Sequence, residues 1–310
     1  MDREKSTHQN NEEGRETIHG GNPMRISIIG VGEMGEWFAE FFQNMGWEIS
    51  LADAETEKAR ELAEVLHAKA HDSNEKAASV GDIILISVPI TKTADVIEET
   101  CSHTKENSLL IDIASVKESP VKKMKQVNTK SELASVHPLF GPGAENLKDR
   151  NIISVPVKVG EKYRKFRKSL SEMGANIEEM EAAEHDKLMA IIQSLTHYTM
   201  LSYLSAFNQM GKSEKALKYK TPMLEGLLNS CRAFLKETPE LCGDIQKENR
   251  YSSFARTKLI KSCNAIDESL ADGDIDEIKE IFRKSRKRLG MNNIKKAYKK
   301  LYGENEEDKE

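Results

Sequence analysis

The chain has 310 residues, of which 38% are hydrophobic and 31% are charged, and its formal net charge is -5. This length predicts two domains, and the composition is typical of a soluble globular protein and excludes fibrous and disordered classes. The acidic balance argues against nucleic acid as a partner. Because no run approaches the ~20 apolar residues of a membrane span and no secretory signal is evident, we expect no membrane partner and a cytoplasmic location.

The four cysteines lie far apart and form no Cys-x-x-Cys pair: Cys101, Cys231, Cys242 and Cys263. Their spacing predicts neither a zinc site nor a disulfide framework, and it indicates reduced, buried thiols. No other cluster of metal-ligating residue types is evident, so we expect no bound metal.

Four segments are expected along the chain. Residues 1–23 and 303–310 are polar and lack an apolar period, so we interpret them as a disordered extension and an acidic tail. Residues 24–180 are expected to form a first domain, and residues 181–302 a second.

The first domain alternates short apolar runs with amphipathic segments. One amphipathic segment follows Gly30 and carries Trp37, Phe38, Phe41 and Phe42 on one side. This alternation predicts the α/β class, with a Rossmann-type doubly wound parallel sheet covered by helices on both faces. The expected strands are 26–29, 47–52, 82–88, 108–113, 133–136, 152–155 and 176–179, and the expected helices between them include 55–66 and 93–101.

The second domain is expected to be all-helical, because strand signals largely vanish after residue 181. The predicted helices are 182–210, 223–236, 251–272 and 275–289. Apolar faces on several sides suit either an intramolecular bundle or a homodimer interface, and we favour the dimer. The Lys- and Arg-rich run 283–300 contains Leu289 and Ile294, which favours a solvated helix face over a nucleic-acid patch.

Residues 30–35 read Gly-Val-Gly-Glu-Met-Gly and follow the first predicted strand. In a dinucleotide-binding turn, Gly30 allows the tight turn, Gly32 lets the backbone approach the pyrophosphate, and Gly35 allows the helix to pack on the strand. Glu33 and Met34 open that helix, where free amides favour phosphate. A glycine turn alone is weak evidence, because it can be purely structural.

Asp53 follows the second predicted strand, 18 positions after Gly35. A carboxylate there accepts hydrogen bonds from ribose hydroxyls and repels a 2'-phosphate, which favours NAD over NADP. The alternative is a surface acid that caps the helix starting near Glu55. Lys58 and Arg60 nearby keep NADP open.

His137 follows an apolar run and begins His-Pro-Leu-Phe-Gly-Pro, at the carboxyl end of a predicted strand. Open parallel sheets bind ligands at that edge, and histidine is the natural base to take the proton of a hydroxyl while hydride leaves the carbon that bears it. A His-Pro pair is also a common turn. The histidines at positions 8, 19, 67, 71 and 103 lack such a pattern, and we assign them to surface roles.

Ser115 also lies just past a predicted strand, where its hydroxyl can bridge substrate, base and nicotinamide or can cap the next helix. In the second domain, Asp186, Gln193 and His197 are spaced seven and four residues apart, so they share one helical face. From the residues alone, solvent is the better interpretation of that face, and His185 beside it is also placed at the surface.

Together these motifs resemble the prephenate and arogenate dehydrogenases of tyrosine biosynthesis. The resemblance spans residues 24–258 and rests on Ile-Gly-Val-Gly-Glu-Met-Gly, Asp-Ile-Ala-Ser-Val-Lys, Ser-Val-His-Pro-Leu-Phe-Gly-Pro and Glu-His-Asp-Lys, with a histidine eleven residues beyond Asp186. It implies that His137 is the base, that Ser115 positions the substrate hydroxyl, and that Gln193 and His197 face the cleft instead of solvent.

The resemblance also implies an arginine that binds a substrate carboxylate, and Arg232 is the candidate. Its distance of seven residues to Pro239 is one longer than the family pattern. Cys242 stands where relatives usually have an aromatic residue, and Pro142 where many have threonine. These departures affect the details of substrate contact.

The implied reaction is oxidative decarboxylation of prephenate to 4-hydroxyphenylpyruvate with reduction of NAD; arogenate is an alternative substrate. A 3-hydroxyacid dehydrogenase is a rival, but that class needs a lysine on the first long helix of the second domain, where this chain has Gln193 and His197. A second rival is a non-catalytic NAD-sensing interaction protein, which would tolerate loss of His137.

Overall fold

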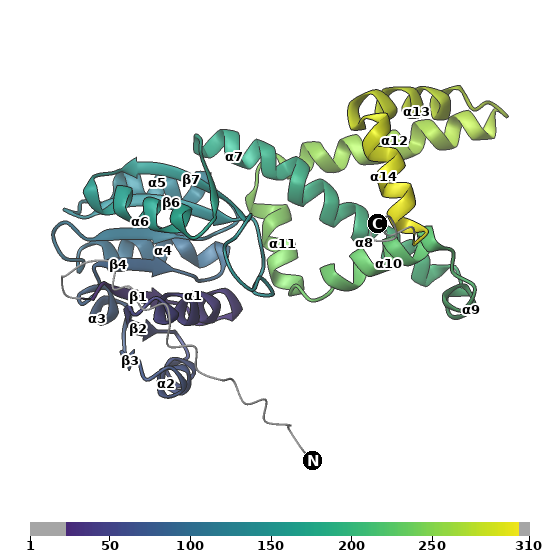
Figure 1. Ribbon diagram of the computed structural model, residues 1–310. Coiled ribbons are helices and arrows are strands. Elements are labelled where there is room, and N and C mark those ends of the chain that lie inside the picture. Colours follow the sequence, from purple (N-terminus) through teal and green to yellow (C-terminus); the bar gives the residue numbers. More distant parts are fainter. Residues whose placement is uncertain (1–22, 304–310) are drawn as a thin grey trace, which may run out of the picture.

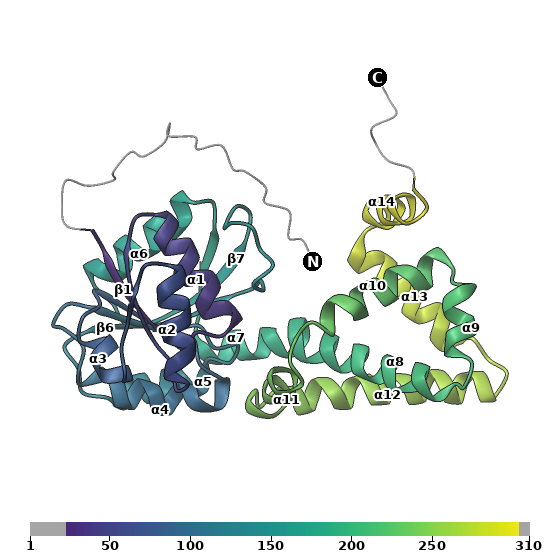
Figure 2. The same ribbon diagram turned by 90° about the horizontal axis from the view of Figure 1, so that it is seen from below.

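The computed structural model describes residues 23–303 (Figure 1). A sheet with helices on both faces forms one half, and helices alone form the other, which extends away from the sheet (Figure 2). The predicted disordered extension and acidic tail fall almost entirely outside the described residues.

Eight strands form one sheet in the order β3-β2-β1-β4-β5-β6-β7-β8. All seven expected strands are present, and the additional β3 has only two residues. The Rossmann-type α/β class is therefore confirmed, with one departure: β7 pairs antiparallel with β6, while β8 is parallel to β7. The strands are β1 (Arg25–Ile29), β2 (Glu48–Ala52), β3 (Lys69–Ala70), β4 (Ile83–Ile86), β5 (Leu109–Asp112), β6 (Glu132–Pro138), β7 (Asn151–Lys158) and β8 (Asn176–Glu179).

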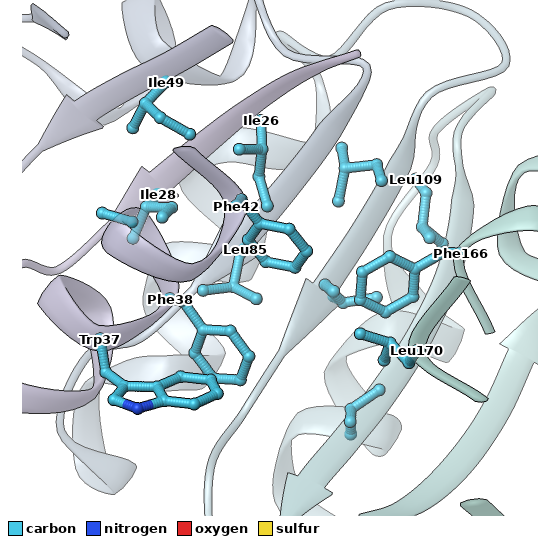
Figure 3. Close-up of a cluster of buried hydrophobic side chains, with 14 of the residues drawn as sticks. Ile26, Ile28, Trp37, Phe38, Phe42, Ile49, Leu85, Leu109, Phe166 and Leu170 are labelled. Carbon is cyan, nitrogen blue, oxygen red and sulfur yellow. The ribbon is translucent and has the colours of Figure 1, made fainter. Parts of the chain in front are cut away.

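Six helices cover the two faces of the sheet. Trp37, Phe38 and Phe42 of α1 pack on the first face as the sequence predicts (Figure 3). Phe42 is fully buried, and its ring centroid lies 4.6 Å from that of Trp47. Apolar contacts with the central strands exclude water from both sides, which is why those strands are almost continuously apolar. The first face carries α1 (Glu33–Asn44), α2 (Thr56–Val65) and α6 (Glu161–Glu172), and the second carries α3 (Asn74–Ala78), α4 (Ile90–Cys101) and α5 (Glu118–Gln126).

The first long helix of the second half differs from the prediction. Instead of one continuous helix, α7 (Ala182–Met189) leads into a π-helical turn, η1 (Ala190–Leu195), and then α8 (Thr196–Gln209). In Figure 2, α12 (Ser252–Ala271) runs alongside this composite element. The remaining helices are α9 (Ser213–Lys218), α10 (Pro222–Phe234), α11 (Pro239–Glu248), α13 (Asp276–Leu289) and α14 (Met291–Leu301).

Several helices of the second half expose their apolar side chains. No residue of α8, α13 or α14 is buried, and Phe282, Leu289 and Tyr298 are each more than half exposed. Between residues 23 and 303, no helix has both the length and the apolar character that a membrane crossing requires.

The two halves meet along α11 and the start of α7. Leu241 and Ile245 of α11 pack on Ile90 and Val116 of the sheet half. An ion pair joins Arg250 to Glu118, with nitrogen and oxygen 2.8 Å apart. These contacts between the two halves place α7 and η1 beside the carboxyl ends of β5 and β6, where the candidate site lies.

Candidate active site

The glycine turn after β1 has the tight geometry that the sequence predicts. Gly30 has a φ of 93°, and a Cβ on it would lie 2.3 Å from the carbonyl oxygen of Ser87. A Cβ on Gly35 would lie 2.0 Å from the carbonyl oxygen of Gly30. A Cβ on Gly32, in contrast, would meet no atom within 4 Å, so the space beside this residue is open. The turn therefore holds the start of α1 against the sheet and leaves room beside its first amides.

Asp53 supports the glycine turn from β2. Its carboxylate accepts hydrogen bonds from the Val31 amide at 2.8 Å and from the Glu55 amide at 2.9 Å. Glu55 is the N-cap residue of α2, so the capping alternative describes one of these two contacts. The side chain is only partly buried, and a carboxylate oxygen can accept a ribose hydroxyl in addition to an amide. Glu33, in the first turn of α1, instead pairs with Lys236 of the helical half at 2.6 Å.

Ser115 lies between β5 and α5, half-buried and without a hydrogen-bond partner among residues 23–303. The expectation that it caps the next helix is wrong, because α5 begins after Lys117. Asp186 of the helical half caps α5 instead: its two oxygens accept the Lys117 and Glu118 amides at 2.8 and 3.0 Å. The Ser115 hydroxyl is therefore free for other partners.

Lys117 is fully buried, and its role was not predicted from the sequence. Its ammonium donates to Asp112 at 3.0 Å and to the Val136 carbonyl at 2.7 Å, which ties β5 to β6 just below His137. Burial lowers the pKa of Lys117, whereas Asp112 and Asp186 oppose that shift. The available signal was its position five residues after Asp112, at the end of the motif that contains Ser115.

His137 lies near the end of β6 and is only 3% exposed. The loop that follows is fastened to α1, since the Trp37 indole donates to the Ala144 carbonyl at 2.6 Å and its ring contacts Phe140. Burial, and then the nearby His185 and Lys117, hold the pKa of His137 well below its usual value. A neutral imidazole is therefore available as a proton acceptor at neutral pH.

His185 is fully buried, so its assignment to the surface is wrong. Its Nε2 lies 2.8 Å from Nδ1 of His137, and its own Nδ1 lies 2.7 Å from Oδ1 of Asp186. Asp186 is 1% exposed, so it does not face solvent either. The available signal was the adjacent His-Asp pair at the start of the first helix after the sheet.

Gln193 and His197 are half-buried and do not face solvent, in contrast to what their spacing alone suggested. The Gln193 amide nitrogen lies 3.5 Å from Nε2 of His137, and His197 stands half-buried against Phe234. Among the described residues, Oε1 of Gln193 and Nδ1 of His197 are buried without a hydrogen-bond partner. Buried polar atoms normally have partners, so these two atoms are suited to receive a ligand. Burial also lowers the pKa of His197.

Arg232 is not joined to this cluster. It is exposed, and its guanidinium contacts Glu225 and Asn229 within α10. Two other side chains that depart from the family pattern have different surroundings: Cys242 is buried in α11, and Pro142 is half-buried in the loop after β6.

None of the other described histidines contacts His137 or His185. His67 and His103 are exposed as expected, whereas His71 is half-buried, and the histidines at positions 8 and 19 lie outside the described residues. Three thiols are buried, but Cys263 is exposed, contrary to the expectation. Across residues 23–303, no three His, Cys, Asp or Glu side chains gather as metal ligands.

Taken together, the carboxyl edge of the sheet carries an open glycine turn, a free serine hydroxyl and a buried, neutral histidine. The helical half closes this edge with a glutamine and a second histidine that have unpaired buried atoms. Such an arrangement can hold an extended cofactor along the sheet edge and can accept a proton from a ligand beside it.

Two family models match the chain. The model described as "Prephenate dehydrogenase, nucleotide-binding domain" matches residues 38–177, and the one described as "Prephenate dehydrogenase, dimerization domain" matches residues 181–284. The glycine turn precedes the first matched segment, so its assignment rests on its geometry.

Curated relatives and solved structures agree with these matches. A protein of Methanocaldococcus jannaschii named "Probable arogenate/prephenate dehydrogenase" is 30% identical over 89% of this chain and 63% of its own length. The "T-protein" of Haemophilus influenzae is 30% identical over 76% of this chain and 59% of its own length, so the chain spans less than two thirds of either relative.

The fold is similar to that of prephenate dehydrogenase from Aquifex aeolicus, solved with hydroxyphenyl propionate and NAD+. The TM-score is 0.70 at 19% identity, over 87% of this chain and 99% of that one. With both halves of the chain matched by models of one family, the chain belongs to the prephenate dehydrogenase family.

Proposed function

We propose that this protein catalyses the oxidative decarboxylation of prephenate to 4-hydroxyphenylpyruvate with NAD as the hydride acceptor. The observation that carries the proposal is the buried, neutral His137 at the same sheet edge as the glycine turn, in a chain of this family. Aromatisation of the ring on loss of carbon dioxide makes the reaction favourable, so the protein has to align the substrate, accept one proton and hold the product.

The residues around the turn fit a dinucleotide. The open space at Gly32 and the first amides of α1, at Glu33 and Met34, suit the pyrophosphate. Asp53 suits the adenosine ribose and favours NAD over NADP. When bound, NAD supplies the hydride acceptor.

The substrate would lie between the sheet edge and η1. His137 accepts the proton of the hydroxyl on ring carbon 4, and the free hydroxyl of Ser115 positions that group. Gln193 and His197 offer their unpaired buried atoms to the substrate. Arg232 is proposed to bind a carboxylate, for which it must exchange its contact with Glu225.

The choice between prephenate and arogenate depends on the side chain of the substrate. Arogenate carries an ammonium where prephenate carries a keto group, and a buried ammonium needs a carboxylate partner. Within the described part of the chain, neither Gln193 nor His197 contacts a carboxylate. This favours prephenate, although the name of the Methanocaldococcus jannaschii relative joins both substrates.

The decisive measurement is NADH formation with prephenate and arogenate, each with NAD and with NADP. Prephenate with NAD should give the highest kcat/KM. His137→Asn should lower kcat by about a hundredfold or more, because a positioned base contributes roughly that much, and should leave NAD affinity nearly unchanged. Unchanged turnover in His137→Asn would refute the assigned base, and NAD binding without turnover on either substrate would favour a sensor protein.

Asp53 provides a separate test of the cofactor. Asp53→Ser removes the charge that favours ribose hydroxyls and should raise the KM for NAD by about tenfold, since a hydrogen bond to a charged group contributes roughly that much. Because Asp53 also holds Val31, Asp53→Asn serves as the control that keeps an acceptor for that amide. A higher preference for NAD in Asp53→Ser would contradict the assignment.

The protein is also proposed to be a homodimer that forms through its helical half. The exposed apolar side chains of α8, α13 and α14 are of the kind that an interface covers, and the family model matched there is described as a dimerization domain.

A further inference from the structure

His185 and Asp186 are buried neighbours at the start of the helical half: His185 contacts the proposed base, and Asp186 contacts His185. We propose that this pair fixes which nitrogen of His137 carries its proton, and that it thereby keeps Nε2 of His137 free to accept a proton. The inference rests on the proposed function only for its consequence in catalysis; the proton position can be measured independently of activity.

The direction of the hydrogen bonds follows from the chemistry of Asp186. A carboxylate only accepts hydrogen bonds, so Nδ1 of His185, 2.7 Å from Oδ1, must donate. In a neutral His185 the other nitrogen, Nε2, then has a lone pair and accepts. His137 lies 2.8 Å away through its Nδ1, which must therefore carry the proton. Only Nε2 of His137 is left with a lone pair.

Further hydrogen bonds fix the orientation of the Asp186 side chain. Its two oxygens also accept the amides of Lys117 and Glu118, at 2.8 and 3.0 Å, and its own carbonyl accepts from Asn249 at 2.7 Å. These contacts come from the sheet half and from the residue that follows α11. The carboxylate is thus held by two amides, and the backbone of Asp186 by Asn249, before any ligand binds, as preorganised sites require.

A charged His185 would reverse the arrangement, because both of its nitrogens would donate and Nδ1 of His137 would have to accept. The surroundings oppose that state. His185 is fully buried beside the Lys117 ammonium, and burial lowers its pKa although Asp186 acts in the opposite direction. The other charge that acts on His185 is Asp112, which is already paired with Lys117.

The free nitrogen of His137 faces the helical half. The Gln193 amide nitrogen, a donor, lies 3.5 Å from Nε2 of His137, which agrees with an acceptor at that position. When Nε2 of His137 takes a proton, Nδ1 of the imidazolium still donates its hydrogen bond to Nε2 of His185. The orientation of His185 is fixed in turn by Asp186. The new positive charge is therefore stabilised by a carboxylate that does not touch the base.

The proton position is tested by nitrogen NMR on the full chain with 15N-labelled histidine, with His137→Asn to assign the signals. In the wild-type protein at neutral pH, Nδ1 of His137 should show the shift of a protonated nitrogen and Nε2 that of an unprotonated one. The opposite pattern would overturn the inference whatever the activity. The expected pattern without NADH formation from either substrate would refute the proposed function alone.

Two substitutions at position 185 test the consequence. His185→Gln keeps a carbonyl acceptor for Nδ1 of His137, whereas His185→Leu removes it. We expect kcat to fall less than about tenfold in His185→Gln and about a hundredfold in His185→Leu, the range of a positioned base, with NAD affinity unchanged in both. His103→Leu, at an exposed histidine, is the control and should change neither kcat nor the His137 signals. Equal losses in both position 185 variants would contradict the role of the acceptor.

Asp186→Asn offers a third test through the direction of donation. An asparagine that turns its NH2 group to Nδ1 of His185 reverses both hydrogen bonds and places the proton of His137 on Nε2. The 15N pattern of His137 should then invert and kcat should fall by about a hundredfold or more, since the wrong tautomer disables the base. A folded Asp186→Asn protein with an unchanged pattern would overturn the inference, and if this variant fails to fold, the two substitutions at position 185 decide.

Discussion

The sheet half and the helical half bury their apolar side chains to very different degrees. Ile26, Ile28 and Phe42 are completely inaccessible to solvent, whereas α8, α13 and α14 bury no residue, and Phe282 is 54% exposed. The sheet half therefore completes its core within one chain. The helical half presents the surface that a second chain would cover, so its stability should depend on protein concentration.

The core of the sheet half is tested at Phe42, where we expect the greatest loss of stability. Phe42→Ala removes a ring that packs against Phe38, Trp47 and Phe166 and should lower the free energy of unfolding by about 3–5 kcal/mol. Chemical denaturation measures the loss. The dissociation constant of the proposed dimer should not change. A Phe42→Ala protein that becomes monomeric while its sheet half keeps its stability would contradict the idea that the sheet half completes its core within one chain.

The proposed dimer surface of the helical half is tested at α13. Phe282→Asp places a charge on the exposed apolar face and should weaken the dimer at least about tenfold, because burial of a large apolar side chain contributes that much. Sedimentation velocity over a dilution series measures the change. Val65→Asp, at a still more exposed apolar position of the sheet half, is the control. If both variants remain dimers with unchanged affinity, α13 is not part of the interface.

The third prediction concerns the seam between the halves, where the proposed base from one half contacts a histidine from the other. His137 has a pKa held below 6.5 by burial, so it stays unprotonated at a lower pH than an ordinary histidine. The acidic limb of kcat/KM should therefore lie below pH 6.5, with activity lost only as pH falls through the lowered pKa. A pH profile from pH 5 to 9 measures this, and a limb above pH 6.5 would contradict it.

Little effect is expected from the exposed ion pair between Lys236 of the helical half and Glu33 of the sheet half. Lys236 and Glu33 form an exposed pair at 2.6 Å, and exposed ion pairs contribute little. Lys236→Ala should change the KM for NAD less than about twofold, and added salt should remove even that difference. A larger change would mean that Lys236 itself contacts the cofactor or the substrate.

Local patterns predicted the sheet half well. Buried parallel strands are short apolar runs, and the glycine turn and the aromatic face of α1 depend on neighbouring residues, so the sequence predicted both. His137 was singled out in the same way, because it directly follows an apolar run, and it lies near the end of β6. The antiparallel direction of β7 was not predicted, because a run of apolar residues has no intrinsic direction.

In the helical half, contacts between residues far apart in the chain limited what could be predicted from the sequence. The π-helical turn η1 packs on residues far along the chain: the Ser194 hydroxyl lies 2.6 Å from that of Ser252, and the Ser194 carbonyl accepts from Gln246. A regular helical period cannot predict such a turn. Likewise, the burial of His185 depends on His137, 48 residues earlier in the chain. The resemblance to a family supplied the cleft-facing position of Gln193, which the spacing alone did not.

The cap that Asp186 provides for α5 has a consequence for motion between the halves. Separating the halves at that point would leave the amides of Lys117 and Glu118 without Asp186, and Nδ1 of His137 without His185, which is costly in the absence of water. The Glu33–Lys236 contact, in contrast, can part in solvent at little cost. Any opening that admits a ligand should thus pivot about the start of α7 and widen beside the glycine turn, so the alignment of the imidazoles would survive each cycle of entry and release.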